Sequence, residues 1–185
     1  MGWRLIRVLL VQANEANISE ASLLSRELKA RFPVPLRVEF PVEEIVLPLF
    51  FYDFNRMQFR ADLINKYLYD KFKLLINKYF LLAVVSGDAY VPGLNFVFGV
   101  ASPQLKVASI YTKRIKTDLN KYIERLLKLA MHELGHLLGL GHCRNRCVMR
   151  FSNSLAELDE KPASFCDECT IKLRKIYNLY VDNES

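Results

Sequence analysis

The sequence of 185 residues is poor in histidine and cysteine, and it lacks long apolar stretches. It contains three histidines, four cysteines and one tryptophan. Its best hydrophobic run, residues 80–85, is far shorter than the roughly 18 residues that a membrane span needs. The formal net charge of +6 is scattered, with no run of five basic residues. We therefore expect no membrane association and no nucleic-acid partner.

The composition is that of an ordinary globular domain. Hydrophobic residues make up 51% of the chain and charged residues 25%, which excludes disordered and collagen-like proteins. The N-terminal segment does not match a signal peptide, because Arg4 and Arg7 interrupt its apolar stretch. We expect a single soluble, cytoplasmic domain over residues 1–185, and a monomer.

Hydrophobic periodicity and turn residues predict an α+β domain with a mixed sheet and helices packed against it. In chain order we expect a strand over 4–11, a helix over 18–32, a strand over 36–40, an irregular loop over 41–52, a helix over 56–79, strands over 80–85, 94–100 and 107–112, and helices over 117–138 and 167–180.

All the histidines belong to one motif, HELGHLLGLGH, over residues 132–142. His132 and His136 are four residues apart, so on a helix they project about 40° apart and can bind one metal ion. Glu133 lies beside that face, where its carboxylate can accept a proton from water on the metal. Two histidines and a glutamate so spaced are typical of hydrolytic zinc sites.

His142 requires a break in that helix. On a continuous helix it would point about 240° away from His136, off the ligand face. Gly139 and Gly141 stand where the chain must turn, since glycine tolerates the positive φ of a helix C-terminus. The pattern predicts three nitrogen ligands and an open fourth position, which is typical of catalytic zinc.

The four cysteines follow immediately, as Cys143 with Cys147 and Cys166 with Cys169. Two close pairs at this separation match a structural zinc site with four thiolates. Two disulfides are an alternative, and a rubredoxin-like iron site is a weaker one. A second ion here would anchor the loop that carries the third histidine.

The segment HELGHLLGLGHC, the following Cys147, Val148 and Met149, and the later CDEC resemble the archaemetzincins, a family of metzincin zinc peptidases. Residues 52–61 and 88–99 also resemble that family. The resemblance implies catalytic zinc on His132, His136 and His142, and Glu133 as general base. It further implies a Met-turn at Met149 and a second zinc on Cys143, Cys147, Cys166 and Cys169.

The fold implied by the resemblance is metzincin-like. A twisted mixed sheet over two helices would form an upper subdomain, about residues 1–139, above a small loop-rich lower subdomain, about 140–185, with a C-terminal helix. Leu94–Phe98 would be the edge strand above the cleft, to which a peptide could add. Tyr52, Asp53 and Arg56 have two interpretations: functional side chains, or a packed tyrosine beside a surface ion pair of Asp53 with Arg56. We favour the second.

The leading hypothesis is therefore a zinc-dependent peptidase that uses two zinc ions per chain and cleaves peptide or protein substrates. Because no propeptide is evident, a narrow substrate range would explain how such an enzyme stays harmless inside a cell. The alternative is a zinc-stabilised interaction module without proteolytic activity, in which the histidine site is vestigial.

Overall fold

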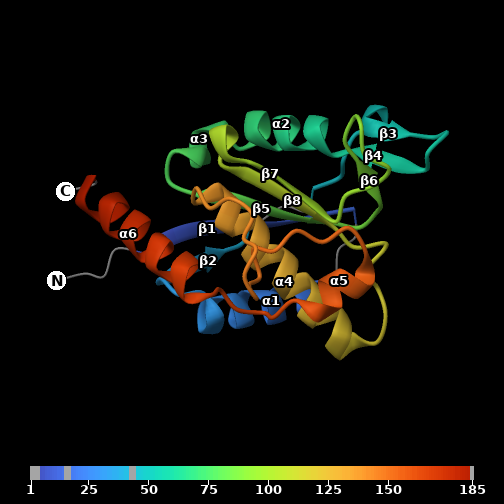
Figure 1. Ribbon diagram of the computed structural model, residues 1–185. Helices are drawn as coiled ribbons and strands as arrows, with labels where there is room; N and C mark the ends of the chain where they lie inside the picture. The colour runs from blue at the N-terminus through green and yellow to red at the C-terminus, as the bar shows by residue number, and fades with distance from the viewer. Residues whose placement is uncertain (1–4, 15–17, 42–44, 184–185) are drawn as a thin grey trace.

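The computed structural model describes residues 5–14, 18–41 and 45–183. Its centre is a five-stranded sheet in the order β2-β1-β5-β8-β7 (Figure 1). Four of these strands run parallel, and β7 pairs antiparallel with β8 at one edge. The strands are β1 (Ile6–Ala13), β2 (Leu36–Glu39), β5 (Phe80–Val85), β7 (Gly99–Ser102) and β8 (Val107–Tyr111).

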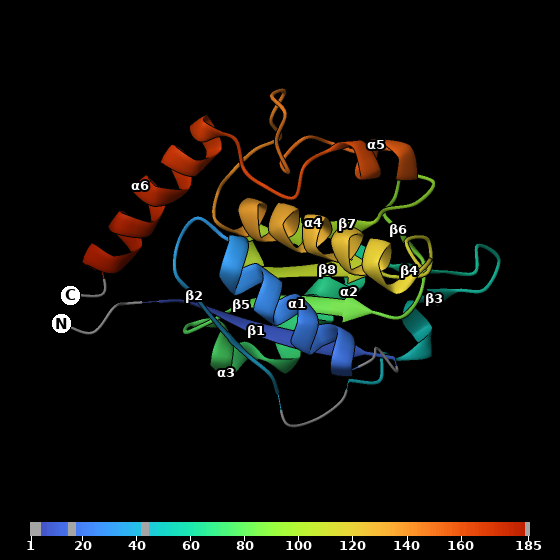
Figure 2. The ribbon, with the colours of Figure 1, turned by 90° about the horizontal axis from the view of Figure 1, so that it is seen from below.

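Helices cover both faces of this sheet. Helices α1 (Ile18–Arg31) and α4 (Leu119–Leu137) lie side by side on one face (Figure 2). Helix α2 (Ala61–Lys71), followed by the short α3 (Lys73–Ile76), lies on the other. Every residue of β5 and β8 is buried, as expected for central strands covered on both sides. The predicted mixed α+β fold is confirmed.

Two helices follow α4: α5 (Leu155–Glu160) and α6 (Asp167–Asn183). The sequence analysis did not predict α5. Its Asp159 carboxylate accepts hydrogen bonds from Nε and Nη2 of Arg125 on α4, both at 2.7 Å. Lys128 Nζ, also on α4, donates to the Asp159 carbonyl oxygen at 2.9 Å. These bonds fix α5 to the helix that carries the first two histidines.

The predicted helix over 56–79 is wrong at its start. Residues 49–60 instead form a 3₁₀ turn (Leu49–Phe51) and a hairpin of β3 (Tyr52–Asp53) with β4 (Gln58–Arg60). Strand β4 then pairs with β6 (Ala89–Tyr90) in a second, three-stranded sheet. Met57 has a φ of 54°, which is incompatible with a helix.

The predicted strand over 94–100 is wrong over its edge segment Leu94–Phe98 and correct only at residues 99–100. The Arg56 guanidinium donates to the carbonyl oxygens of Leu94 (3.2 Å) and Asn95 (2.9 Å), so these groups are occupied by a side chain. Val97 forms only an isolated bridge with Ala89. The edge strand is β7, which begins at Gly99.

The same arginine corrects the interpretation of the 52–56 segment. Tyr52 packs edge-on against the Phe59 ring at 4.8 Å, so the packed tyrosine is confirmed. The Asp53 carboxylate accepts hydrogen bonds from the Tyr90 hydroxyl and from the backbone N–H groups of Asn55 and Arg56. The predicted ion pair with the Arg56 side chain is absent, because that side chain reaches the 94–95 loop.

Other predicted elements differ from the structure by a few residues at their ends. The first strand was expected from Arg4, which lies outside the described residues, as do residues 42–44 of the predicted loop. No helix in the described part of the chain combines the length and apolar character of a membrane span.

The junction between α4 and α5 gives a pH-dependent prediction. The Arg125 guanidinium lowers the pKa of Asp159 to about 2, below an ordinary value of about 3.9. A carboxyl whose pKa is lowered by folding stabilises the fold at any pH above its ordinary pKa. That stabilisation is lost as the pH falls from about 4 to 2. Because the side chain is 28% exposed, we expect Asp159→Asn to cost about 1–2 kcal/mol at pH 7.

Urea unfolding of both proteins at pH 7, 5 and 3 measures this difference. It should remain constant from pH 7 to 5 and shrink at pH 3. Glu160→Gln, at an exposed neighbouring position, serves as the control and should change the free energy of unfolding by less than about 0.5 kcal/mol. A difference for Asp159→Asn that does not vary with pH would contradict the assignment.

Candidate active site

The structure brings the three histidines together. His132 and His136 project from the last turns of α4, and their Nε2 atoms are 3.0 Å apart. His142 follows the helix, and its ring centroid lies 5.4 Å from that of His132 and 4.9 Å from that of His136. One nitrogen of each ring lies within 4.8 Å of the others, close enough for a single ion to be shared.

The chain returns His142 to this group through a turn at Gly139. Gly139 has a φ of 91°, its N–H donates to the carbonyl of His136, and the Leu140 N–H donates to the carbonyl of Gly135. These two bonds define a Schellman motif, in which glycine is favoured at the left-handed position. The predicted break at Gly139 is confirmed, whereas a positive φ is not found at Gly141.

The hydrogen bonds of the histidines fit a metal ion. His132 Nδ1 lies 2.9 Å from the Val148 carbonyl oxygen, and His136 Nδ1 lies 2.8 Å from that of Leu140. A carbonyl only accepts, so both Nδ1 atoms carry hydrogen and both Nε2 atoms present lone pairs. Two lone pairs facing each other at 3.0 Å repel unless a cation lies between them.

Burial keeps these imidazoles in the neutral form that binds metals. It lowers the pKa of all three histidines, and that of His132 to about 3. An imidazole without charge at neutral pH can offer its lone pair to an ion. The donor chemistry of this cluster is therefore that of a zinc site.

Glu133 is buried beside the histidines, under the edge strand. Only 4% of its surface is exposed, and burial raises the pKa of its carboxyl to about 8, while the charge of Lys161 opposes that rise. A Cβ atom at Gly99 would lie 2.6 Å from Glu133 Oε1, so glycine at the start of β7 makes room for this carboxyl. The sequence analysis did not single out Gly99.

Met149 lies directly against α4. A Cβ atom at Gly135 would be 2.4 Å from Met149 Sδ, so the glycine within HELGH lets the methionine pack below the histidines. The Met149 carbonyl accepts a hydrogen bond from the Cys143 N–H at 3.0 Å. The role of Gly135 was missed, and its only signal was a glycine inside a helix, which usually has a packing reason.

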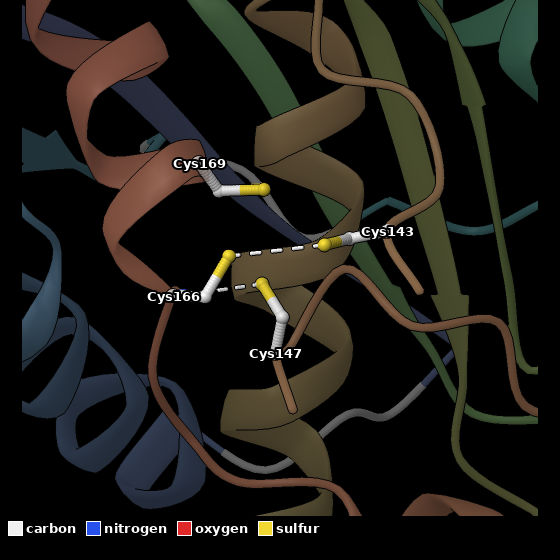
Figure 3. Close-up of side chains that lie close together, drawn as sticks. All are labelled: Cys143, Cys147, Cys166 and Cys169. Carbon is white, nitrogen blue, oxygen red and sulfur yellow. Dashed lines mark hydrogen bonds between the residues drawn. The ribbon is translucent and has the colours of Figure 1, made fainter. Parts of the chain in front are cut away.

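The four cysteines form a second cluster (Figure 3). Their Sγ atoms all lie within 4.8 Å of one another, with Cys143 and Cys166 at 3.7 Å, and none forms a disulfide. Sulfurs around a tetrahedral zinc, with Zn–S of about 2.3 Å, are about 3.8 Å apart. Cys147 Sγ also accepts the N–H groups of Met149 (3.5 Å) and Cys166 (3.3 Å). Burial raises the pKa of the Cys147 thiol, and these two hydrogen bonds oppose that rise.

A cleft of about 570 Å³ opens beside the histidines. Its walls include Glu133, the beginning of β7, the 96–98 segment and the 151–153 segment. Lys161 also lines it, and burial lowers the pKa of that lysine to about 8. Most of the remaining lining is apolar, as in many ligand-binding clefts.

Comparisons with known proteins agree with this geometry. The model of peptidase family M54 matches residues 25–175. The archaemetzincin of Aeropyrum pernix is 46% identical over 156 residues, which cover 81% of this chain and 84% of that protein.

Two solved structures are similar to this chain along most of their length. The zinc-dependent peptidase from Methanocorpusculum labreanum has a TM-score of 0.80 and 31% identity, with 90% of this chain and 99% of that chain covered. The archaemetzincin from Methanopyrus kandleri has a TM-score of 0.79 and 33% identity, with 94% and 96% covered. The chain therefore belongs to peptidase family M54, the archaemetzincins, and is a zinc metallopeptidase that acts on peptides or proteins.

Proposed function

We propose that this peptidase holds one catalytic zinc on His132, His136 and His142, and that Glu133 is its general base. The observation that carries the proposal is the pair of Nε2 atoms 3.0 Å apart, each on a ring whose Nδ1 is bonded to a carbonyl. This arrangement satisfies the rings only when they share a cation, and Glu133 is the acidic side chain beside them in the cleft.

When bound, zinc would supply Lewis acidity, since it lowers the pKa of a coordinated water to about 7 and polarises a carbonyl oxygen. Glu133 takes a proton from the attacking water and passes it to the leaving amine. Its burial under Gly99 excludes bulk water and holds the carboxyl in one place. A cation nearby also favours its ionised form, against the effect of burial.

We propose further that the substrate binds as an extended strand along β7. This strand lies at the edge of the sheet, and residues 99–101 line the cleft beside Glu133. An edge strand offers unpaired N–H and C=O groups to an added peptide. Because mostly apolar walls surround the bound substrate, we expect this cleft to accept few substrates rather than to digest unfolded proteins generally.

The cysteines would hold a second, structural zinc. Cys143, Cys147, Cys166 and Cys169 would close its coordination shell, so this ion would have no open position for water. It would join the loop after Gly139 to the start of α6 and so form the core of a lower subdomain over about 140–185. Because Cys143 follows His142 directly, this ion would also fix the loop that delivers the third histidine.

The general-base role is tested with Glu133→Gln, which keeps the side-chain volume beneath Gly99. We expect the variant to retain zinc and to lose at least about 10²-fold in kcat/KM, the usual contribution of a general acid–base. Cleavage of a mixed peptide library, followed by mass spectrometry, measures the activity, with Glu160→Gln as a surface control. Cleavage by Glu133→Gln at the wild-type rate would refute this role.

The two-zinc assignment predicts distinct losses of metal. The native protein should contain two zinc ions per chain by elemental analysis, while His142→Ala and Cys169→Ser should each contain one. Only the cysteine variant should have a lower Tm, by at least about 10 °C, because structural zinc contributes several kcal/mol to folding. One zinc in the native protein, or an equal loss of stability in both variants, would contradict the assignment.

A further inference from the structure

The cleft wall contains a positive charge that the proposed mechanism does not use. Lys161 lines the cleft, yet only 3% of its surface is exposed, which places it deep in the wall. Its Nζ donates one hydrogen bond, to the Arg150 carbonyl oxygen at 3.2 Å. An ammonium group has three donors, so two remain available.

Among the described residues, no carboxylate oxygen lies within 4.0 Å of Lys161 Nζ. Glu133 is the acidic group that acts on its charge most strongly, but only through space. A charge removed from water without a direct partner is costly, and proteins avoid such an arrangement unless a ligand completes it.

The neighbouring buried cations are paired. Lys128 Nζ lies 2.7 Å from a Glu124 carboxylate oxygen and also donates to the Asp159 carbonyl. The Arg125 guanidinium forms two bonds to the Asp159 carboxylate. Lys161 differs from both because its charge faces the cleft and lacks a counter-ion.

A second polar group in the same wall also lacks a partner. Ser152 Oγ is buried and forms no hydrogen bond, although a buried hydroxyl is normally satisfied. Ser152 lines the same cleft as Lys161, amid mostly apolar side chains. Lys161 and Ser152 are therefore two polar groups of one cleft that can each donate a hydrogen bond to a ligand.

The end of helix α5 fixes the position of Lys161 in the cleft wall. Lys161 is the C-cap of α5, directly after Glu160, and its N–H donates to the Glu157 carbonyl at 3.3 Å. Helix α5 is fixed to α4 by Asp159, as described above. The ammonium group is therefore placed on a rigid support relative to the histidines of α4, which suits a specificity-determining residue.

We propose that Lys161 and Ser152 form a subsite for a carboxylate group of the substrate, supplied by an aspartate or glutamate side chain or by the C-terminus of a peptide. A carboxylate would give Lys161 its counter-ion and accept the Ser152 hydroxyl proton in a hydrogen bond. An uncharged amide of the same shape would not balance the charge. The proposal names the substrate class of the proposed protease site and rests on that function.

Matched peptides test the carboxylate subsite. One set consists of pentapeptides blocked at both ends, identical except for a central Asp, Asn, Glu or Gln. A second pair consists of alanine pentapeptides with a free or an amidated C-terminus. Binding is measured calorimetrically on the zinc-loaded Glu133→Gln protein, which binds without turnover, and cleavage is measured on the native enzyme.

In one set, we expect the peptide with the carboxylate to bind at least about tenfold more tightly than the matching peptide with an amide. Hydrogen bonds to charged groups change affinity by that factor or more. The set that shows the preference identifies the source of the carboxylate. In the Glu133→Gln background, Lys161→Met should bring the ratio close to 1, whereas Lys116→Met, at an exposed lysine that does not line the cleft, should leave it unchanged. Ser152→Ala should reduce it about two- to fivefold.

A ratio near 1 in every set, or no measurable binding at all, would overturn the proposal. A preference that persists in Lys161→Met would also overturn it, because the carboxylate would then be bound by zinc alone. Failure of the proposed function would look different: the Lys161-dependent binding preference would be present, but the native enzyme would cut none of the peptides.

Discussion

The arrangement of this site depends on the left-handed turn at Gly139. Helix α4 places His132 and His136 on one face but cannot supply a third ligand from the same face. The Schellman bonds to His136 and Gly135 end the helix and reverse the chain. Leu140 follows Gly139, and its carbonyl accepts a hydrogen bond from His136 Nδ1. The same turn therefore also orients the His136 ring.

The loop after this turn connects the histidine cluster with the cysteine cluster. The Val148 carbonyl orients His132, the Met149 side chain packs against Gly135, and Met149 also bonds to Cys143 through its backbone. Residues 142–149 therefore contribute to the histidine cluster, to the cysteine cluster and to the packing between them. The proposed structural zinc would therefore hold the same loop that completes the proposed catalytic site.

Much of the fold and the location of the site followed from local patterns. The central strands were predicted because they are continuous apolar runs, and the end of α4 because Gly139 stands between spaced histidines. The predictions for segments 56–60 and 94–98 were wrong because contacts between distant residues determine their conformation. The Arg56 side chain donates hydrogen bonds to the carbonyls of Leu94 and Asn95, which are 38 and 39 residues away. Lys161 was missed since its place in the cleft depends on how α5 docks.

The central claim is that three imidazoles share one zinc ion whose remaining position is open to water and substrate. Crystals of the zinc-loaded protein, measured at the zinc absorption edge, test it directly by anomalous scattering. We expect one peak about 2.0–2.1 Å from Nε2 of His132, Nε2 of His136 and a ring nitrogen of His142, and a second about 2.3 Å from the four Sγ atoms. A single peak, or a protein side chain as fourth ligand of the histidine-bound ion, would contradict it.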